Sequence, residues 1–471
     1  MRQTPGGRPH GRLSLFENVG FALGDTASNF FLQTFNIFLL YYYTDVFGID
    51  AAVAGTMFLV TRLWDAVNDP IMGILCDRTR TRWGKYRPYL LWVSVPYGIF
   101  GYLIFANPPL EGAAKVVYAY FSYSMMMMAY TAINVPYSSL MGVLSPSSHA
   151  RTVASNFRFA GAYGGGLLIS MHVRTLVERL GGGNELRGFQ YTMGLFAVAS
   201  VVLFWVTFLS TRERVQPPEG QRQNLREELG ELARNRPWII LCCAALFSTT
   251  FIAIRDSVTL HYFKYVVGAG GDAVFLGMDR VSLFLSLGRL MMMLGVLAVG
   301  FLIRRVDKKP LSAWLTFGTA ACWFLFYFVP PGNYGLMLAL NAAGSFMMGP
   351  TSALVWSMYG DVADYGESRF GRRSTGLIHS ASLFSMKTGT MIAGFLGGHL
   401  LAGFGFVANR AQSETTLRGI LLMFSVIPAL CAAGKGVALL LYPLDRPKVL
   451  AVEKDLAAKK GGPRYDSNQT P

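Results

Sequence analysis

Long apolar runs alternate with short polar segments from residue 13 to residue 443. A helix needs about 20 predominantly apolar residues to cross the hydrocarbon core, where it must satisfy its own backbone hydrogen bonds. At that length the chain accommodates about twelve such helices with their loops. The runs predict spans at 14–43, 51–75, 88–107, 115–143, 153–176, 190–210, 237–266, 279–303, 310–329, 334–358, 374–406 and 417–443. We therefore expect an all-α membrane protein with twelve transmembrane helices.

Charged residues are few and unevenly distributed. Of the 471 residues, 15% are charged, whereas a soluble protein carries about 25%. The formal net charge of +15 resides mainly in alternate short loops, such as 77–88, and in the two tails. Because basic residues mark the cytoplasmic loops of membrane proteins, we expect both termini to be cytoplasmic and the chain to reside in the plasma (bacterial inner) membrane. This pattern also argues against nucleic acid as a partner.

A central polar segment divides the chain into two halves. The sequence GILCDR at 73–78 follows the second predicted span, and GFLIRR at 300–305 follows the eighth. Internal repeats are typical of transporters in which two halves rock around a central site. We expect a six-plus-six architecture of the major facilitator type, with an N-terminal half (1–210), a cytoplasmic linker (211–236), a C-terminal half (237–443) and a cytoplasmic tail without regular structure (444–471).

Charged residues with balanced signs occur inside the predicted spans. They are Asp25, Arg62, Asp65, Asp69, Arg158, Arg255, Asp256 and Lys387. Each would cost at least about 2.5 kcal/mol if left alone in lipid, so such residues mark binding sites, ion paths or paired networks. A hydrated cavity between the two halves would serve them all.

The second span holds the densest polar cluster. Arg62, Asp65 and Asp69 follow one another at intervals of three and four residues, which return to the same helix face. With Asn68 they form an oxygen-rich group beside a guanidinium, a composition that suits a small hard cation or a proton. The alternative role for the two acids is a permanent salt-bridge network with Arg62.

The fourth span adds Tyr130, Thr131 and Asn134. Their hydroxyl and amide oxygens can complete a cation shell or bind sugar hydroxyls, and their alternative role is hydrogen bonding between helices. Tyr130 and Trp356 are candidates for an aromatic platform under a sugar ring. The tyrosines at 41–43 lie at a span end, as in an interfacial aromatic belt.

Several segments together resemble a known transporter family. They are YYYTDVFGI (41–49), WDAVNDPIMG (64–73), TRTRWGKYRPYLLW (79–92), INVPYSSL (133–140), HYFKYVVG (261–268) and DVADYGE (361–367). In this order they resemble the glycoside–pentoside–hexuronide:cation symporters, the family of the melibiose permease. The resemblance covers nearly the whole chain, and WDAVNDPIMG with RWGKYRP is its most specific part.

The resemblance implies a major facilitator fold and symport of a sugar or glycoside with Na+, H+ or Li+. The residues that it implies for the cation and its coupling to the substrate are Asp65, Asp69, Asn68, Thr131, Arg62 and Lys387. No cofactor is implied apart from the coupling ion. We expect a monomer in the lipid bilayer, with a small-molecule sugar or glycoside as its partner.

The candidate substrate residues depart from the family pattern in two places. The candidates are Asp25, Asn29, Asn134, Arg158, Tyr130, Arg255 and Trp356. Asn29 and Asn134 stand where the melibiose permease has sugar-binding aspartates. An amide both donates and accepts, whereas a carboxylate only accepts, so melibiose itself is not the expected substrate.

Other functions compete with sugar symport. The same fold could carry an anionic or lipid-like organic solute, with Arg255 pairing a substrate carboxylate unless its neighbour Asp256 already occupies it. Facilitation without coupling is a further alternative, against which the two acids argue. An enzyme is not expected, because His172, His261 and His379 lie on separate predicted spans without catalytic or metal spacing.

Overall fold

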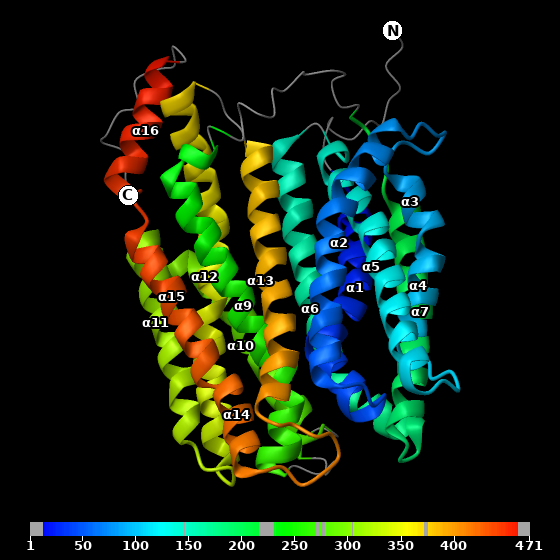
Figure 1. Cartoon of the computed structure of the whole chain (residues 1–471). Helices are drawn as coiled ribbons and strands as arrows, with labels where there is room; N and C mark the ends of the chain where they lie inside the picture. Colours follow the sequence, from blue (N-terminus) through cyan, green and yellow to red (C-terminus); the bar gives the residue numbers. More distant parts are fainter. Residues whose placement is uncertain are drawn as a thin grey trace. The chain divides into compact units, whose positions relative to one another are not determined.

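The computed structural model describes residues 13–459, apart from 146, 216–229, 231, 269–273, 276–277, 304 and 372–374. Helices dominate this part of the chain (Figure 1). The first set is α1 (Leu15–Thr34), the π-helices η1 (Phe35–Leu39) and η2 (Tyr42–Val46), α2 (Ala51–Arg78), α3 (Arg87–Trp92), α4 (Ser94–Ile104), α5 (Gly112–Val143), α6 (Ser148–Gly181) and α7 (Glu185–Ser210). The second set is α9 (Arg236–His261), the π-helix η3 (Tyr262–Val267), α10 (Arg280–Leu302), α11 (Lys308–Leu325), the 3₁₀-helix η4 (Phe326–Phe328), α12 (Tyr334–Phe370), α13 (Thr375–Gly403), α14 (Glu414–Phe424), α15 (Val426–Leu441) and α16 (Arg446–Lys459).

Each of the twelve predicted spans coincides with one of these helices or with consecutive helical segments. Five segments of the described chain are long and apolar enough to cross a membrane by length and composition. They are Glu185–Ser210, Arg236–Val267, Arg280–Val299, Lys308–Phe328 and Glu414–Leu441. The prediction of an all-α membrane protein is therefore confirmed.

The predicted tail is partly wrong. Residues 446–459 form α16, which packs against α12, and Ser368 of α12 donates a hydrogen bond of 2.6 Å to Asp455 of α16. Buried Leu456 anchors the same helix. The apolar positions that allow this docking are too sparse to stand out in a polar tail. Most of the predicted linker helix lies outside the described residues.

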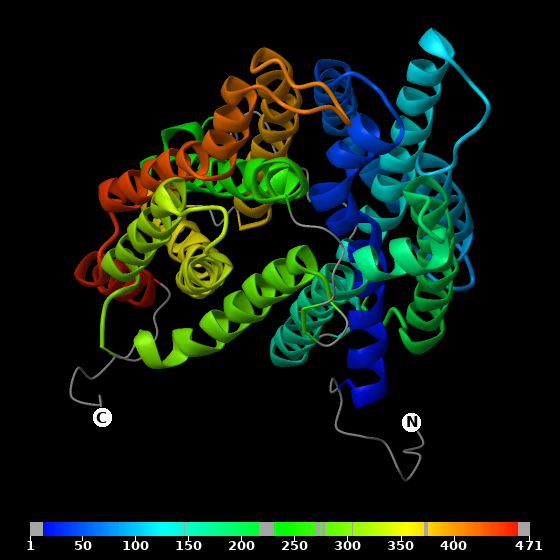
Figure 2. The ribbon, with the colours of Figure 1, turned by 90° about the horizontal axis from the view of Figure 1, so that it is seen from below.

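The chain forms two compact units whose boundaries differ from the predicted halves. The first unit comprises Met1–Gly220, Thr259–Ser286 and Gly397–Thr416, and the second comprises Gln221–Val258, Leu287–Leu396 and Leu417–Pro471. In the first unit α1 packs against α6 and α7, and in the second α11 packs against α12 and α15 (Figure 2). The first unit gains later segments because they pack directly on its own helices; Gly398, for example, lies against the backbone at Ala51 and Gly55.

Side-chain caps fix the starts of the early helices. Ser14 and Glu17 form a reciprocal capping box at α1, with the Ser14 amide donating to the Glu17 carboxylate at 2.8 Å. Asp50 accepts from the amide of Ala52 at 2.8 Å and so caps α2. These caps satisfy amides that the first helical turn leaves without partners.

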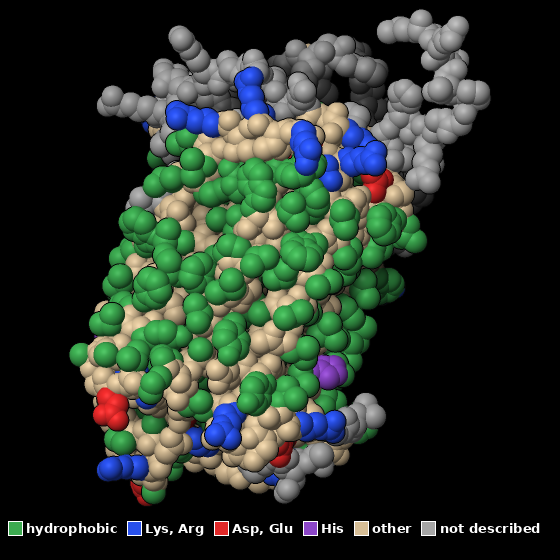
Figure 3. Space-filling view, turned by 90° about the vertical axis from the view of Figure 1, so that its right-hand side faces the viewer, with side chains coloured by type: hydrophobic (Ala, Val, Ile, Leu, Met, Phe, Trp, Pro, Cys, Tyr) green, Lys and Arg blue, Asp and Glu red, His purple; other side chains and the backbone are tan. Residues whose placement is uncertain are grey.

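The outer surface carries a broad apolar band. On the face shown in Figure 3, hydrophobic side chains cover the middle, while Lys and Arg gather at the two ends. Ile99 on α4 and Val198 and Leu209 on α7 are 52%, 64% and 71% exposed. Such a contiguous patch fits a lipid environment rather than water.

A carboxylate after α7 holds the basic loop between α2 and α3. Glu213 accepts hydrogen bonds from the backbone amides of Lys85, Tyr86 and Arg87 at 2.9, 2.7 and 3.0 Å. Gly84 permits this approach, because its φ is +112° and an added Cβ would lie 2.3 Å from the Glu213 carboxyl carbon. The clamp thus depends on both residues.

Two glycines let α10 and α12 touch through their backbones. A Cβ on Gly295 would lie 2.1 Å from the Phe346 carbonyl oxygen, and a Cβ on Gly349 would lie 2.1 Å from the Met292 carbonyl oxygen. Small residues at such crossings allow close packing of membrane helices.

Gly349→Ala should therefore destabilise the protein by about 1–3 kcal/mol, because the methyl group must push the two backbones apart. Thermal unfolding of the purified protein in detergent measures the loss. Gly360→Ala on the same helix is the matched control, since nothing lies within 4 Å of its added Cβ. Equal effects of the two substitutions would contradict the assignment of Gly349 to a helix crossing.

Candidate functional site

The polar cluster predicted on the second span lies on α2. Arg62 Nη1 lies 3.4 Å from Asp65 Oδ2, and the side chains of the two residues are 9% and 2% exposed. Asp69, one turn further on, accepts a hydrogen bond of 2.9 Å from the Thr131 hydroxyl on α5. Each acid therefore has a different neighbour, a guanidinium for Asp65 and a hydroxyl for Asp69.

These contacts gather four of the predicted cation and coupling residues in one place. α2 supplies Arg62 and both carboxylates, and α5 supplies the buried Thr131, which is 2% exposed. Carboxylate and hydroxyl oxygens are the ligands that small hard cations prefer. Asn68 follows on the same helix and is partly buried. We call Arg62, Asp65, Asp69 and Thr131 the α2 cluster.

A second polar cluster joins α1, α5 and α6 in the same unit. Arg158 Nε lies 3.3 Å from Asp25 Oδ2, and its guanidinium lies 5.1 Å from the centre of the Tyr137 ring. The Asp25 and Arg158 side chains are 12% and 24% exposed. The ion pair and the aromatic ring below it lower the free-energy cost of burying both charges inside a helix bundle.

The two asparagines predicted to replace sugar-binding aspartates belong to this second cluster. Ser28 donates a hydrogen bond of 3.1 Å to Asn134 Oδ1, and Asn134 Nδ2 donates to the Tyr130 carbonyl at 3.2 Å. Asn29 Nδ2 donates to the Asp25 carbonyl at 2.8 Å. Their amides are thus oriented by neighbouring groups. We call Asp25, Ser28, Asn29, Asn134 and Arg158 the α1 cluster.

Arg255 lies in the second unit inside an aromatic cage. Its guanidinium carbon lies 4.7, 4.8 and 4.1 Å from the ring centres of Trp323, Phe326 and Phe424, and Nη1 donates to the Phe424 carbonyl at 2.8 Å. Arg255 is only 4% exposed. Three rings and a carbonyl already satisfy much of this cation.

The suggested neutralisation of Arg255 by Asp256 is not what the structure shows. Asp256 instead accepts a hydrogen bond of 2.6 Å from Arg289 on α10, a residue absent from the predicted set of buried charges. Adjacent residues on a helix point in different directions, so sequence neighbours rarely pair.

Two further candidates lie in the second unit. Lys387 is part of α13 and is partly buried. Trp356 of α12 packs against a cluster that contains Tyr359, whose ring centre lies 5.7 Å away. Their roles in coupling and substrate binding stay predictions.

Lys435 on α15 is a buried cation that the sequence analysis missed. It is 2% exposed, and Nζ donates to the hydroxyls of Ser248 and Thr351, both at 3.1 Å. Among the described residues no carboxylate pairs with it. The signal was present in the sequence, because a lysine interrupts the apolar run PALCAAGKGVALLL.

A buried network around Asp45 was also missed. The Asp45 side chain is 0% exposed and lies 2.8 Å from Lys264 Nζ and 3.3 Å from His261 Nε2. Tyr265 donates to the same carboxylate, and Asn409 Nδ2 donates to the Asp45 carbonyl at 2.6 Å. The network joins segments from both predicted halves within the first unit. We call it the Asp45 network.

The prediction of an interfacial belt at residues 41–43 is wrong. Tyr41, Tyr42 and Tyr43 are 2%, 0% and 0% exposed. Tyr42 packs in the interior against Phe105 and Phe189, with ring centres 4.7 and 5.4 Å away. Aromatic residues at a span end serve a core as readily as an interface, and sequence position does not separate the two roles.

The geometry of the first unit supports binding rather than covalent chemistry. The α2 cluster offers oxygen ligands for a small cation, and the α1 cluster offers amide, hydroxyl, carboxylate and guanidinium groups that can bind polar hydroxyl-rich molecules.

Comparison with known proteins points in the same direction. The family described as "MFS/sugar transport protein" matches residues 20–446. The chain is 37% identical over 453 residues to the putative glycoside/cation symporter YagG of Escherichia coli, covering 94% of this chain and 95% of that protein. It is 33% identical to the isoprimeverose transporter of Lactiplantibacillus pentosus, covering 92% and 90%. The crystal structure of a D-xylose–proton symporter shares the fold, with a TM-score of 0.59 and 15% identity over 88% of this chain and 96% of that one.

Asp45→Asn should destabilise the protein, because it leaves Lys264 without the charge that compensates it. Removing one partner of a buried ion pair costs about 3–5 kcal/mol, and we expect the lower end because Lys264 is partly exposed. The shift of the thermal unfolding midpoint in detergent measures this loss. Glu111→Gln, which removes an exposed carboxylate, is the control and should leave the midpoint unchanged. An unchanged midpoint for Asp45→Asn would show that the network carries no stability.

Proposed function

The chain belongs to the MFS/sugar transport family, and from this premise we infer that it is a secondary active transporter that couples uptake of a sugar or glycoside to a cation gradient. The names of two relatives support a sugar or glycoside as the substrate, since one is a putative glycoside/cation symporter and the other an isoprimeverose transporter. Transport in this family is not an enzymatic reaction.

The observation that carries this proposal is the α2 cluster. Two carboxylates one turn apart repel each other, and Arg62 Nη1 lies 3.4 Å from Asp65 Oδ2. A Na+ ion or a proton at Asp69 would relieve the repulsion, with Thr131 as a further oxygen ligand and Asn68 next to it in sequence.

The sugar or glycoside would bind at the α1 cluster. Asn29 and Asn134 offer amides, and the Asp25–Arg158 pair offers both an acceptor and donors for hydroxyl groups. Tyr130 is a further candidate in the same unit. Lys387 and Trp356, which belong to the second unit, keep the coupling and substrate roles predicted from the sequence.

Coupling follows from mutual stabilisation of the two ligands. If the cation favours the conformation that binds sugar, the sugar favours cation binding by the same free energy. A tenfold cation gradient supplies about 1.4 kcal/mol, and about 100 mV adds roughly 2.3 kcal/mol per charge. Together they allow roughly 500-fold accumulation of a neutral sugar at one-to-one stoichiometry, since each 1.4 kcal/mol is a factor of about ten.

Alternating access provides the route. The two six-helix halves would rock around a central site. The protein would be a monomer in the inner membrane, with both termini in the cytoplasm. Na+ and H+ remain the two candidate coupling ions.

A second candidate keeps the fold and changes the cargo to an anionic glycoside or another organic anion. Lys435 favours it, because this buried cation is bound by two hydroxyls and, among the described residues, by no carboxylate. A carboxylate on the substrate would supply the missing charge. Competition by uronides at concentrations where neutral glycosides have no effect would select this candidate.

Asp65→Asn or Asp69→Asn should abolish gradient-driven uptake, because the coupling ion loses a ligand. The measurement is uptake into proteoliposomes over a panel of labelled glycosides, pentosides and hexuronides, with Na+ and pH gradients imposed separately. Asp50→Asn is the matched control on the same helix, since asparagine caps a helix as well as aspartate does. Normal Na+- or H+-stimulated accumulation by either variant would refute the assignment.

A further inference from the structure

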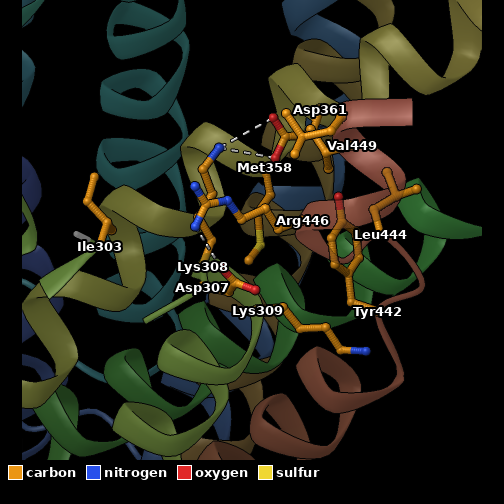
Figure 4. A pocket seen from close by; sticks show the side chains of 11 residues that line it. Ile303, Asp307, Lys308, Lys309, Met358, Asp361, Tyr442, Leu444, Arg446 and Val449 are labelled. Carbon is orange, nitrogen blue, oxygen red and sulfur yellow. Dashed lines mark hydrogen bonds and ion pairs between the residues drawn. The ribbon is translucent and has the colours of Figure 1, made fainter. Parts of the chain in front are cut away.

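A cavity of about 730 Å³ opens in the second unit. It lies at the ends of α10 and α15, beside the starts of α11 and α16 and one face of α12 (Figure 4). Its lining combines the basic side chains Lys308, Lys309 and Arg446 with Asp307, Asp361 and a set of apolar residues. We call it the basic pocket.

The start of α11 contributes positive potential to the basic pocket. Asp307 occupies the N-cap position but makes no capping hydrogen bond with its side chain, and no acid lies in the first turn. Lys308 and Lys309 occupy that turn instead. The amides of an uncapped helix start favour an anion, and two lysines reinforce the preference.

Tyr442 provides a second and independent sign of a missing ligand. It is 1% exposed and lines the pocket, and its hydroxyl has no hydrogen-bond partner among the described residues. Figure 4 shows this hydroxyl at the end of the ring nearer to Asp361. Buried hydroxyls are usually satisfied, so an unsatisfied one that lines a cavity indicates an absent acceptor.

Basic side chains outnumber carboxylates in the lining of the pocket. Lys308 Nζ lies 3.2 Å from Asp361, and Arg446 lies 3.7 Å from Asp307. No carboxylate pairs with Lys309 in the described part of the chain. The Arg446 side chain is 67% exposed, so its loose pairing leaves it available to a bound anion. Figure 4 shows the Lys309 ammonium pointing away from the Arg446 guanidinium and the Tyr442 hydroxyl, so a phosphate beside Arg446 and Tyr442 would draw in Lys309 by rotation of its flexible side chain.

The surroundings of the pocket identify the source of that phosphate. Ile303 at the end of α10 and Leu450 on α16 line the pocket and are 42% and 46% exposed. Leu297 and Phe301 continue the apolar surface along α10, at 72% and 59% exposure, and Leu441 on α15 is 67% exposed. An anionic phospholipid fits this arrangement, with its headgroup in the basic pocket and its acyl chains along exposed apolar helix faces.

We propose that the basic pocket binds the phosphate headgroup of an anionic phospholipid through Lys309, Arg446 and Tyr442. The proposal does not depend on which substrate the protein carries. The exposed apolar side chains beside the pocket distinguish a lipid from a soluble phosphate, which would gain nothing from them.

The test uses the full chain purified in detergent and stripped of lipid. Added phosphatidylglycerol should raise the thermal unfolding midpoint, and native mass spectrometry should show a retained lipid, whereas phosphatidylcholine should do neither at the same concentration. Lys309→Gln and Tyr442→Phe should each weaken phosphatidylglycerol binding at least fivefold. Tyr442→Phe should fold as well as the parent without lipid, because it removes only an unsatisfied hydroxyl.

Lys448→Gln is the matched control, since Lys448 lies two positions from Arg446, pairs with Asp445 and does not line the pocket. It should keep the full response. Equal responses to phosphatidylglycerol and phosphatidylcholine, or equal losses in Lys448→Gln and Lys309→Gln, would overturn the proposal. Glycerol 3-phosphate tests a soluble phosphate in the same assay. If it raises the unfolding midpoint as much as phosphatidylglycerol does, the lipid assignment is also overturned.

Discussion

A charge inside a membrane helix is tolerated only when the protein itself compensates it, and this constraint organises the described structure. Arg158 pairs with Asp25, Arg289 with Asp256, and Lys264 with Asp45. Other groups also stabilise buried cations: two hydroxyls accept from Lys435, and three aromatic rings surround Arg255. The helices are held in register by these pairings as well as by apolar packing.

The same constraint makes the α2 cluster unusual. Its two acids lie on one helix face, yet their surroundings differ, because Asp65 faces a guanidinium and Asp69 a hydroxyl. The hydroxyl beside Asp69 adds an oxygen of the kind that a small hard cation prefers. The transport role proposed for these acids therefore depends on carboxylate and hydroxyl oxygens gathered from α2 and α5.

The sequence predicted much of this arrangement and missed identifiable parts. The twelve helical spans and the α2 cluster follow from apolar run length and from helical spacing, which are local properties. The burial of Tyr41 to Tyr43, the pairing of Asp256 with Arg289 and the docking of α16 depend on contacts between distant segments. Periodicity along one helix cannot reveal which neighbour that helix will meet. Lys435 was visible as a lysine in an apolar run, but its hydroxyl partners were not.

The order in which the chain is synthesised determines when the Glu213 clamp can form. The loop at 85–87 emerges from the ribosome long before Glu213, which follows it by 126 to 128 residues. During that interval the loop is without this clamp, and in the proposed topology its basic residues hold the adjoining ends of α2 and α3 on the cytoplasmic side. The carboxylate arrives only after α7 has been synthesised. The same loop therefore has two roles in succession: its basic side chains orient the helices during insertion, and its backbone amides later bind Glu213 in the folded protein.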